Sequence, residues 1–296
     1  MKVSIVGAGR VGRVLGALAK RAGNEIGDVV CRSARSAASA KRFIGDGEAR
    51  DSLQPSALDA DLILICVTDD RIAGTARLLS RFDRPGSTPS SRKRRRVALH
   101  TSGAVSSEAL SPLREIGISI GSCHPLQTFE SPARALPRVK SSYFCIEGDP
   151  DAIRAARRLV RAIGGRHIVL PPDLKGLYHA AAVMASGGLV ALLSVCSELM
   201  STCGLTERES LDVLLPLVQG TVDNVRQSGV VEALTGPVRR GDLGTLKKNL
   251  TTVERYCPGR LDLYRILAER SLDLAKRQGM SQSRIESMRR IISGSS

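Results

Sequence analysis

The sequence lacks tryptophan and has few aromatic residues of any kind. Only 3% of its 296 residues are aromatic, although 42% are hydrophobic. Aliphatic side chains must therefore fill the core, and few rings are available to stack on nucleic-acid bases. A chain of this length gives a soft expectation of two domains.

Paired cysteines are also lacking. The seven cysteines are odd in number, scattered, and never arranged as Cys-x-x-Cys, which favours free thiols in a reducing compartment and argues against a zinc site. A signal peptide is not indicated, because the first apolar run is short and Arg10 and Arg13 follow it. We therefore expect a cytoplasmic protein without a metal ion.

Acidic residues are fewer than basic ones, and the net charge is +15. The one true basic run, Arg92–Arg96, ends a stretch rich in Ser, Pro and Arg that begins at Pro85. A solvated surface insertion explains this run better than a nucleic-acid site, because no nucleic-acid-binding motif accompanies it. Nucleic-acid binding through the run stays an alternative. The general excess of arginine favours anionic ligands such as a phosphorylated cofactor.

Long hydrophobic runs are rare, and one stretch raises the question of a membrane. Ala180–Ser197 carries no charge and has the length of a membrane span. Much of it is Ala, Ser and Gly, however, and no other stretch resembles it. We therefore expect a central helix buried in a helical domain, and no membrane association.

The strongest motif stands at the start of the chain, where Lys2–Gly16 reads KVSIVGAGRVGRVLG. A β-branched apolar segment precedes glycines in Gly-x-Gly-x-x-Gly spacing, and apolar residues then recur at helical spacing. A strand, a tight glycine turn and a helix N-terminus in this order cradle the pyrophosphate of a dinucleotide. The residues expected to contact the cofactor here are Gly7, Gly9, Arg10, Val11 and Gly12.

The residues after the second predicted strand, Asp28–Cys31, indicate which dinucleotide binds. A unit that prefers NAD has Asp or Glu about twenty residues past the fingerprint, where it binds the ribose hydroxyls. This chain has Arg32, Ser33 and Arg35 there instead. Guanidinium and hydroxyl groups suit a 2′-phosphate. We therefore predict NADP, with a solvated basic loop as the alternative.

Short apolar strands alternate with helical segments as far as Leu170, which is typical of an α/β domain with a doubly wound, mostly parallel sheet. The chain beyond Pro171 has only helical patterns, so the predicted domains are residues 1–170 and an all-α region, 171–296. Ligands of open α/β sheets bind at the carboxyl ends of the strands. Further cofactor contacts are therefore assigned to residues at the ends of two predicted strands, Asp61–Val67 and Val97–Leu99: Val67, Thr68, Asp69, His100 and Ser102.

Four motifs carry a family resemblance: the His100–Gly103 turn, the Cys123–Phe129 loop, the helix start Lys175–Ser186, and Leu234–Pro237 followed by Arg240-Gly241-Asp242. With them the chain resembles the superfamily of β-hydroxyacid dehydrogenases and pyrroline-5-carboxylate reductases, in which an NADP-binding Rossmann domain precedes a helical domain. More closely, it resembles Rossmann-like proteins with a DUF2520 C-terminal domain. Those are similar in turn to coenzyme-F420-dependent NADP oxidoreductases.

The resemblance implies a set of catalytic residues. Hydroxyacid dehydrogenases place Lys, and four residues later Asn, at the start of the interdomain helix, where this chain has Lys175 and His179. Residues four apart share a helix face, so both are expected to face the cleft beside the nicotinamide, with Lys175 as proton donor. His124 is a third candidate. The alternatives are a solvated Lys175, a loop-tying His124, and a Tyr178 that donates a proton or packs half-buried.

The function implied by the resemblance is that of a cytoplasmic NADP(H)-dependent oxidoreductase. It would transfer a hydride to or from a small carbonyl or imine compound in the interdomain cleft. A homodimer is implied as well, because the helical domain of this superfamily commonly pairs with its twin. Two alternatives are hydride exchange between NADP and deazaflavin F420, and an NADP(H)-sensing protein without turnover.

Overall fold

The computed structural model describes residues 1–83 and 96–294, so the expected insertion lies outside the described residues apart from Arg96. The chain divides into two units, Met1–Ser186 and Gly187–Ser296. This division falls later than the predicted boundary after Leu170. The difference arises because the first turns of the long helix contact the sheet of the first unit, as described below.

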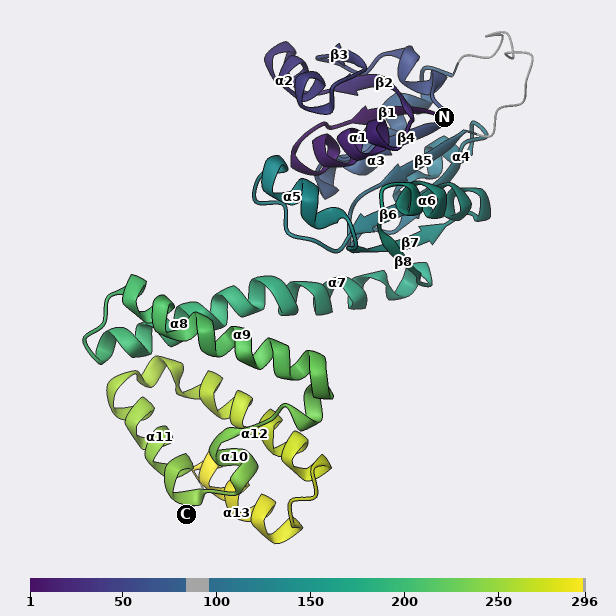
Figure 1. Ribbon diagram of the computed structural model, residues 1–296. Helices are drawn as coiled ribbons and strands as arrows, with labels where there is room; N and C mark the ends of the chain where they lie inside the picture. Colours follow the sequence, from purple (N-terminus) through teal and green to yellow (C-terminus); the bar gives the residue numbers. More distant parts are fainter. Residues whose placement is uncertain (84–95, 295–296) are drawn as a thin grey trace. The chain divides into compact units, whose positions relative to one another are not determined.

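The described part of the first unit contains one sheet of eight strands (Figure 1). The strands are β1 (Lys2–Val6), β2 (Glu25–Val30), β3 (Glu48–Arg50), β4 (Leu62–Ile65), β5 (Val97–His100), β6 (Ser119–Pro125), β7 (Tyr143–Gly148) and β8 (Arg166–Val169). Their order is β3-β2-β1-β4-β5-β6-β7-β8, with the first six strands parallel and β7 and β8 running the opposite way. This confirms the predicted doubly wound, mostly parallel sheet, whose order reverses between β1 and β4.

Helices cover both faces of this sheet. The first face carries α1 (Arg10–Arg21), α2 (Ala34–Ile44), α5 (Pro132–Val139) and α6 (Pro150–Ala162). The second carries α3 (Asp69–Ser80), α4 (Ser111–Arg114) and the short 3-10 segments Pro55–Asp59 and Ser107–Leu110. Because successive side chains of a strand point to opposite faces, Leu62 and Leu64 pack on the first layer and Ile63 and Ile65 on the second.

The second unit is helical throughout, as predicted. It holds α8 (Leu189–Thr202), α9 (Glu207–Glu232), α10 (Gly236–Arg240), α11 (Leu243–Tyr256), α12 (Leu261–Arg277) and α13 (Gln282–Ser293). Its core includes the fully buried side chains of Leu246, Leu272 and Met288. A capping box between Thr206 and Glu209 starts α9, because the hydroxyl of Thr206 satisfies a backbone N–H that the first helical turn leaves unpaired.

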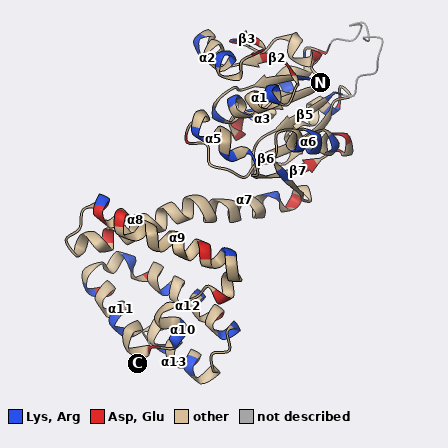
Figure 2. Cartoon of the chain, viewed as in Figure 1, with Lys and Arg blue, Asp and Glu red and all other residues tan. Residues whose placement is uncertain are grey.

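The long helix begins with a 3-10 turn, Pro172–Leu174, and α7 (Lys175–Val183). A π-helical segment, Met184–Gly188, then joins α7 to α8 at the two consecutive glycines. The whole helix, Pro172–Thr202, is apolar and long enough to cross a membrane, which by itself is weak evidence for a span. Figure 2 shows α7 and α8 free of charged residues along most of their length.

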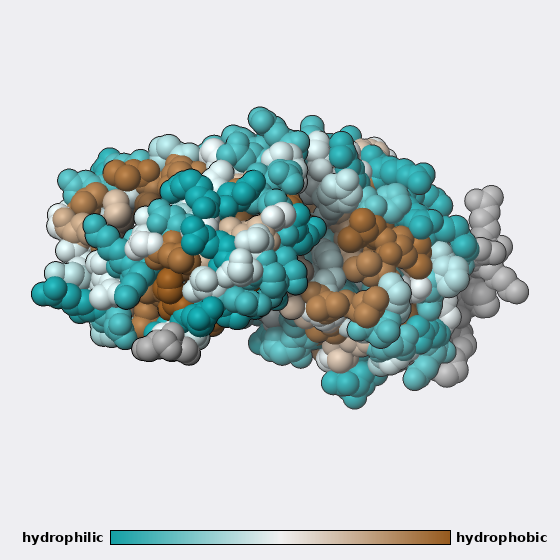
Figure 3. Space-filling model, turned by 90° about the horizontal axis from the view of Figure 1, so that it is seen from below, coloured by the Kyte–Doolittle hydropathy of each residue, from teal (hydrophilic) through white to brown (hydrophobic). Residues whose placement is uncertain are grey.

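The expected burial of this helix is wrong for the single chain. Only 6% of its most apolar window is buried. Apolar residues gather in several surface patches, seen as brown areas in Figure 3. The exposed apolar residues of α8 and α9 include Val190, Leu217 and Val230, each about 60–70% exposed. The sequence pattern alone could not reveal this, because a helix covered by a partner has the same composition as a helix buried in its own chain.

Candidate functional site

The glycine turn has the geometry that a dinucleotide requires. Gly7 has a φ of +88°, and a Cβ there would lie 2.8 Å from Val67 and 2.9 Å from Cys66. A Cβ at Gly12 would lie 2.7 Å from the Gly7 carbonyl oxygen, so α1 can approach β1 this closely only with glycine. At Gly9, by contrast, the nearest atom would be 4.0 Å away. The open side of Gly9 at the N-terminus of α1 therefore fits a pyrophosphate.

The second predicted cofactor contact lies beside this turn. The backbone N–H groups of Gly7 and Ala8 both donate to the carbonyl oxygen of Val30, the last residue of β2. Arg32 and Arg35 follow this strand; both are exposed, and neither forms an ion pair within the described residues. The Ser33 hydroxyl is already engaged, because it caps α2 by accepting from the Ser36 N–H at 3.3 Å. The two guanidiniums are thus the free groups of this loop.

The remaining predicted cofactor residues of the glycine turn and of β4 lie at the same edge of the sheet. Arg10 begins α1 and is exposed, and Val11 is half-buried. The side chain of Val67 lies nearest to Gly7. Thr68 precedes α3, and its hydroxyl makes no capping hydrogen bond, while Asp69 is exposed in the first helical turn. The structure therefore brings the ends of β1, β2 and β4 together around the turn.

His100 and Ser102 form a tight turn at the end of β5. The Ser102 hydroxyl accepts from the N–H groups of Ala104 and Val105, at 3.2 and 3.0 Å. The Ser102 N–H donates to His100 Nδ1 at 3.2 Å, so the proton of this neutral imidazole is on Nε2. His100 has no exposed surface, and burial lowers its pKa to about 3, with the charge of Lys175 acting in the same direction.

A buried polar row crosses three strands at this level. His100 of β5 lies beside Ser122 of β6, and Ser122 lies opposite Glu147 of β7. None of the three side chains is more than 1% exposed. Ser107 holds the carboxylate with its backbone N–H at 2.9 Å and its hydroxyl at 2.6 Å. Burial by itself would raise the pKa of Glu147, but these hydrogen bonds and the charge of Lys175 hold it below its ordinary value.

Lys175, at the start of α7, contacts two members of this row, Ser122 and Glu147. It is the first residue of α7 and is fully buried, so the alternative of a solvated lysine is wrong. Its Nζ lies 3.2 Å from Oε1 of Glu147 and donates a hydrogen bond to the Ser122 hydroxyl. Burial lowers the pKa of Lys175, while the Glu147 carboxylate opposes that effect. An ammonium held in this way presents no surface to a bound substrate.

The other candidates meet one helical turn further along α7. His124 Nδ1 and the Tyr178 hydroxyl are 3.0 Å apart. The ring of His179 lies edge-on to that of His124, with 5.5 Å between the centroids. Burial, His179 and Lys175 together lower the pKa of His124 to about 4, and burial raises the pKa of Tyr178. At neutral pH the cluster thus holds an uncharged imidazole beside a protonated phenol.

A glycine makes room for this cluster. A Cβ at Gly103 would overlap Nδ1 of His179 and would lie 2.9 Å from ring atoms of His124. The Nδ1 atom of His179 is buried and has no hydrogen-bond partner within the described residues. Gly103 therefore lets the end of β5 approach both imidazoles, which is a close approach that no other residue permits.

Sequence reasoning missed three members of the site: Ser107, Ser122 and Glu147. Glu147 did leave a signal, because it continues the strand alternation that begins at Tyr143 and so points to the face opposite Phe144 and Ile146. A carboxylate at a buried strand position requires a partner. That partner is Lys175, which lies 28 residues further along the chain, too far for a local sequence pattern to reveal the pair.

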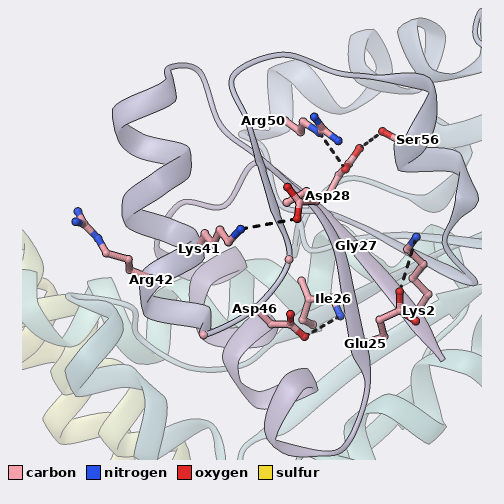
Figure 4. Close-up of a pocket in the computed structure, with 13 residues that line it drawn as sticks. Lys2, Glu25, Ile26, Gly27, Asp28, Lys41, Arg42, Asp46, Arg50 and Ser56 are labelled. Atoms are coloured by element: carbon pink, nitrogen blue, oxygen red, sulfur yellow. Dashed lines mark hydrogen bonds and ion pairs between the residues drawn. The ribbon is translucent and has the colours of Figure 1, made fainter.

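A separate hollow of about 660 Å³ lies at the other end of β1 and β2, near Lys2 and Glu25 (Figure 4). Its acidic groups are already paired. Asp28, for example, accepts from Arg50 at 3.3 Å and from Ser56 at 2.6 Å. The hollow thus offers no unpaired carboxylate that could act as a base or bind a cation. No cluster of three or more metal-ligating side chains occurs in the described ranges.

Comparisons with known proteins agree with this architecture. A family model described as a Rossmann-like domain matches residues 1–125, and one described as a domain of unknown function, DUF2520, matches residues 142–271. The chain belongs to the Rossmann-like proteins with a DUF2520 domain. The predicted family and fold class are therefore confirmed. A search of curated protein sequences gives no significant match.

Solved structures share the fold over nearly the whole chain. Protein TM1727 from Thermotoga maritima is 26% identical, with a TM-score of 0.73 over 94% of this chain and 100% of that chain. BF3122 from Bacteroides fragilis, described provisionally as an NADP oxidoreductase, is 21% identical, with a TM-score of 0.68 over 92% and 98%. A pyrroline-5-carboxylate reductase from Streptococcus pyogenes is 13% identical, with a TM-score of 0.62 over 94% and 98%.

Proposed function

We propose that this protein is an NADP(H)-dependent oxidoreductase that transfers a hydride to or from a small carbonyl or imine compound. One observation carries the proposal: a single edge of the sheet holds the glycine turn and then, at the ends of β5 and β6, a cluster of imidazoles with the phenol of Tyr178. The edge therefore combines a dinucleotide cradle with groups that can handle a proton. Its similarity in fold to pyrroline-5-carboxylate reductase and an imine reductase supports the same use of this edge.

The cofactor would lie along this edge from the end of β2 toward the end of β5. In this proposal the N-terminus of α1 binds the pyrophosphate over Gly9, and Arg32 and Arg35 bind the 2′-phosphate. His100 and Ser102 line the far end. When bound, the nicotinamide would supply or accept the hydride.

Tyr178, His124 and His179 are proposed to contact the substrate. A phenol whose pKa is raised stays protonated at neutral pH, so it can donate to a substrate oxygen or nitrogen, or to His124. Nδ1 of the uncharged His124 shares a hydrogen bond with the Tyr178 hydroxyl, and the other ring nitrogen faces Gly103. Because the ammonium of Lys175 is fully buried, we assign Lys175 a role behind these groups and not direct contact with the substrate.

A second copy of the chain is the proposed partner. The exposed apolar residues of α8 and α9 need a cover, and these two helices pack on each other within the second unit. A membrane suits this surface poorly, because α9 also carries the exposed Arg226, paired with the half-buried Asp223, between its apolar residues. The protein is further proposed to be cytoplasmic, which agrees with the seven free cysteines.

Calorimetry of NADPH binding, followed by NADPH oxidation with a panel of carbonyl and imine compounds, tests the proposal. The variant Gly9→Ala places a methyl group in the open cradle and should weaken NADPH binding at least tenfold, about 1.4 kcal/mol. Gly74→Ala is the matched control, because a Cβ there meets nothing within 4 Å, much as at Gly9, where the nearest atom is 4.0 Å away. Failure of the wild type to bind NADPH would contradict the proposal. Tight binding without any oxidation would favour a sensor.

A further inference from the structure

We propose that Glu147 is a positioning residue of this site: through its buried ion pair with Lys175 it determines where α7 begins on the sheet, and so places Tyr178 and His179 against His124. The inference rests on the proposed function for what the placed groups do. The placement itself rests on contacts within the first unit.

The carboxylate of Glu147 is held by hydrogen bonds that do not involve α7. It lies on β7 opposite Ser122, and both of its oxygens accept hydrogen bonds from Ser107. The same Oε1 that accepts the Ser107 N–H also faces Lys175 Nζ at 3.2 Å. A buried carboxylate without a cation would be costly, so this anchor requires an ammonium at one point above the sheet.

In α7, Lys175 supplies the ammonium that pairs with the Glu147 carboxylate. It is the one buried residue of α7, all of which is described. The apolar residues of the same helix do not fix its position, since Leu177 is 72% and Val183 is 51% exposed. The start of α7 is therefore held on the sheet by a polar contact and not by apolar packing. An amphipathic helix is usually held by its apolar face, whereas here a charged side chain makes the buried contact.

The position of Lys175 decides where the next turn of the helix points. Tyr178 and His179 follow at three and four residues, the spacing that shares a helix face with Lys175. A shift of the helix by one residue would rotate each side chain by about 100°. Such a rotation would break the hydrogen bond of 3.0 Å between Tyr178 and His124. It would also withdraw His179 from the space left by Gly103.

The test uses Glu147→Gln, Lys175→Met and the double variant, with Glu108→Gln as a matched control, because Glu108 is exposed and pairs with Arg114. Each single variant leaves a buried group without its partner and should lower the melting temperature. The double variant removes both charges and should recover most of that loss. The control should melt like the wild type.

Nuclear magnetic resonance of labelled histidine then separates positioning from stability. The chain has four histidines, so the signals of His124 and His179 can be followed individually. His124, which faces Tyr178, His179 and Lys175, should titrate near 4 in the wild type. In Glu147→Gln, which keeps the charge of Lys175, the pKa of His124 should be at least one unit higher, because α7 no longer covers the ring.

Turnover gives the second readout. In the double variant kcat should fall at least tenfold while the NADPH dissociation constant stays within about threefold of wild type. The proposal is overturned if folded Glu147→Gln keeps the wild-type His124 titration. If that variant does not fold, a double variant with wild-type His124 titration and kcat overturns it equally. A wild type that oxidises no NADPH would contradict the proposed function alone, since the titration of His124 does not depend on turnover.

Discussion

Tyr178 and His124 share a hydrogen bond of 3.0 Å although 54 residues separate them in the chain. The bond joins the start of α7 to the end of β6 inside the first unit. It brings a protonated phenol within hydrogen-bond distance of an imidazole. Burial lowers the pKa of this imidazole to about 4. A protonated phenol and an uncharged imidazole are thus paired at the edge of the sheet where the glycine turn also lies.

Removal of the phenol in Tyr178→Phe should therefore lower turnover by about 10²–10⁴-fold, the usual contribution of a positioned acid or base. NADPH affinity should barely change, because the phosphate groups of the cofactor are proposed to bind at the glycine turn and to Arg32 and Arg35, away from Tyr178. Tyr143→Phe is the control: this tyrosine is 44% exposed and stacks on Arg166. Steady-state kinetics on the first compound that supports NADPH oxidation provides the measurement. A loss of less than about threefold would remove Tyr178 from the mechanism.

Stability should fall in mild acid because of the buried imidazoles. Burial lowers the pKa of His124 to about 4 and that of His100 to about 3. In the unfolded chain both histidines have the ordinary histidine pKa of about 6.5. The stability that the two uncharged imidazoles contribute is therefore fully present above about pH 6.5. It is lost progressively as the pH falls toward 4 and then 3. In His124→Asn the loss between pH 6.5 and 4.5 should be smaller by about 2 kcal/mol. Parallel denaturation profiles for both proteins would contradict this assignment.

NADP(H) should bind at least tenfold more tightly than NAD(H), a difference of about 1.4 kcal/mol. The cause would be the two exposed guanidiniums of Arg32 and Arg35, which have no ion-pair partner within the described residues. Replacing both by alanine should narrow the difference and leave NAD(H) affinity nearly unchanged. Arg42→Ala, an exposed position at the other end of α2, serves as control. Equal calorimetric affinities in the wild type would rule out the preference.

The apolar residues of α8 and α9 should keep the protein dimeric. A variant with Val190→Asp and Leu217→Asp would put charge on two side chains that are 68% exposed in the single chain. Light scattering should then give the mass of one chain in place of two. Leu78→Asp, on α3 of the first unit, changes a leucine that is 49% exposed and should leave the mass unchanged. A monomeric wild type would refute the proposed partner.

Local patterns were enough to predict the sheet domain. The glycine spacing, the short β-branched runs and the helical periodicity each depend on residues a few positions apart, so they can be read along the chain. The strand they missed was β3, whose Glu-Ala-Arg has no apolar alternation and which forms by pairing with β2. Helix α2 begins at Ala34, before its first buried residue, Ala37, because Ser33 caps it.

The sequence by itself determined the family, the mostly parallel sheet, the helical region and the glycine turn at the end of β1. Tertiary structure alone decided that Lys175 is buried and paired with Glu147. It also decided that Tyr178 meets His124, and that the long apolar helix is exposed in the single chain. The physical reason is distance along the chain: burial, ion pairing and the pKa of an imidazole depend on groups that only folding brings within a few ångströms.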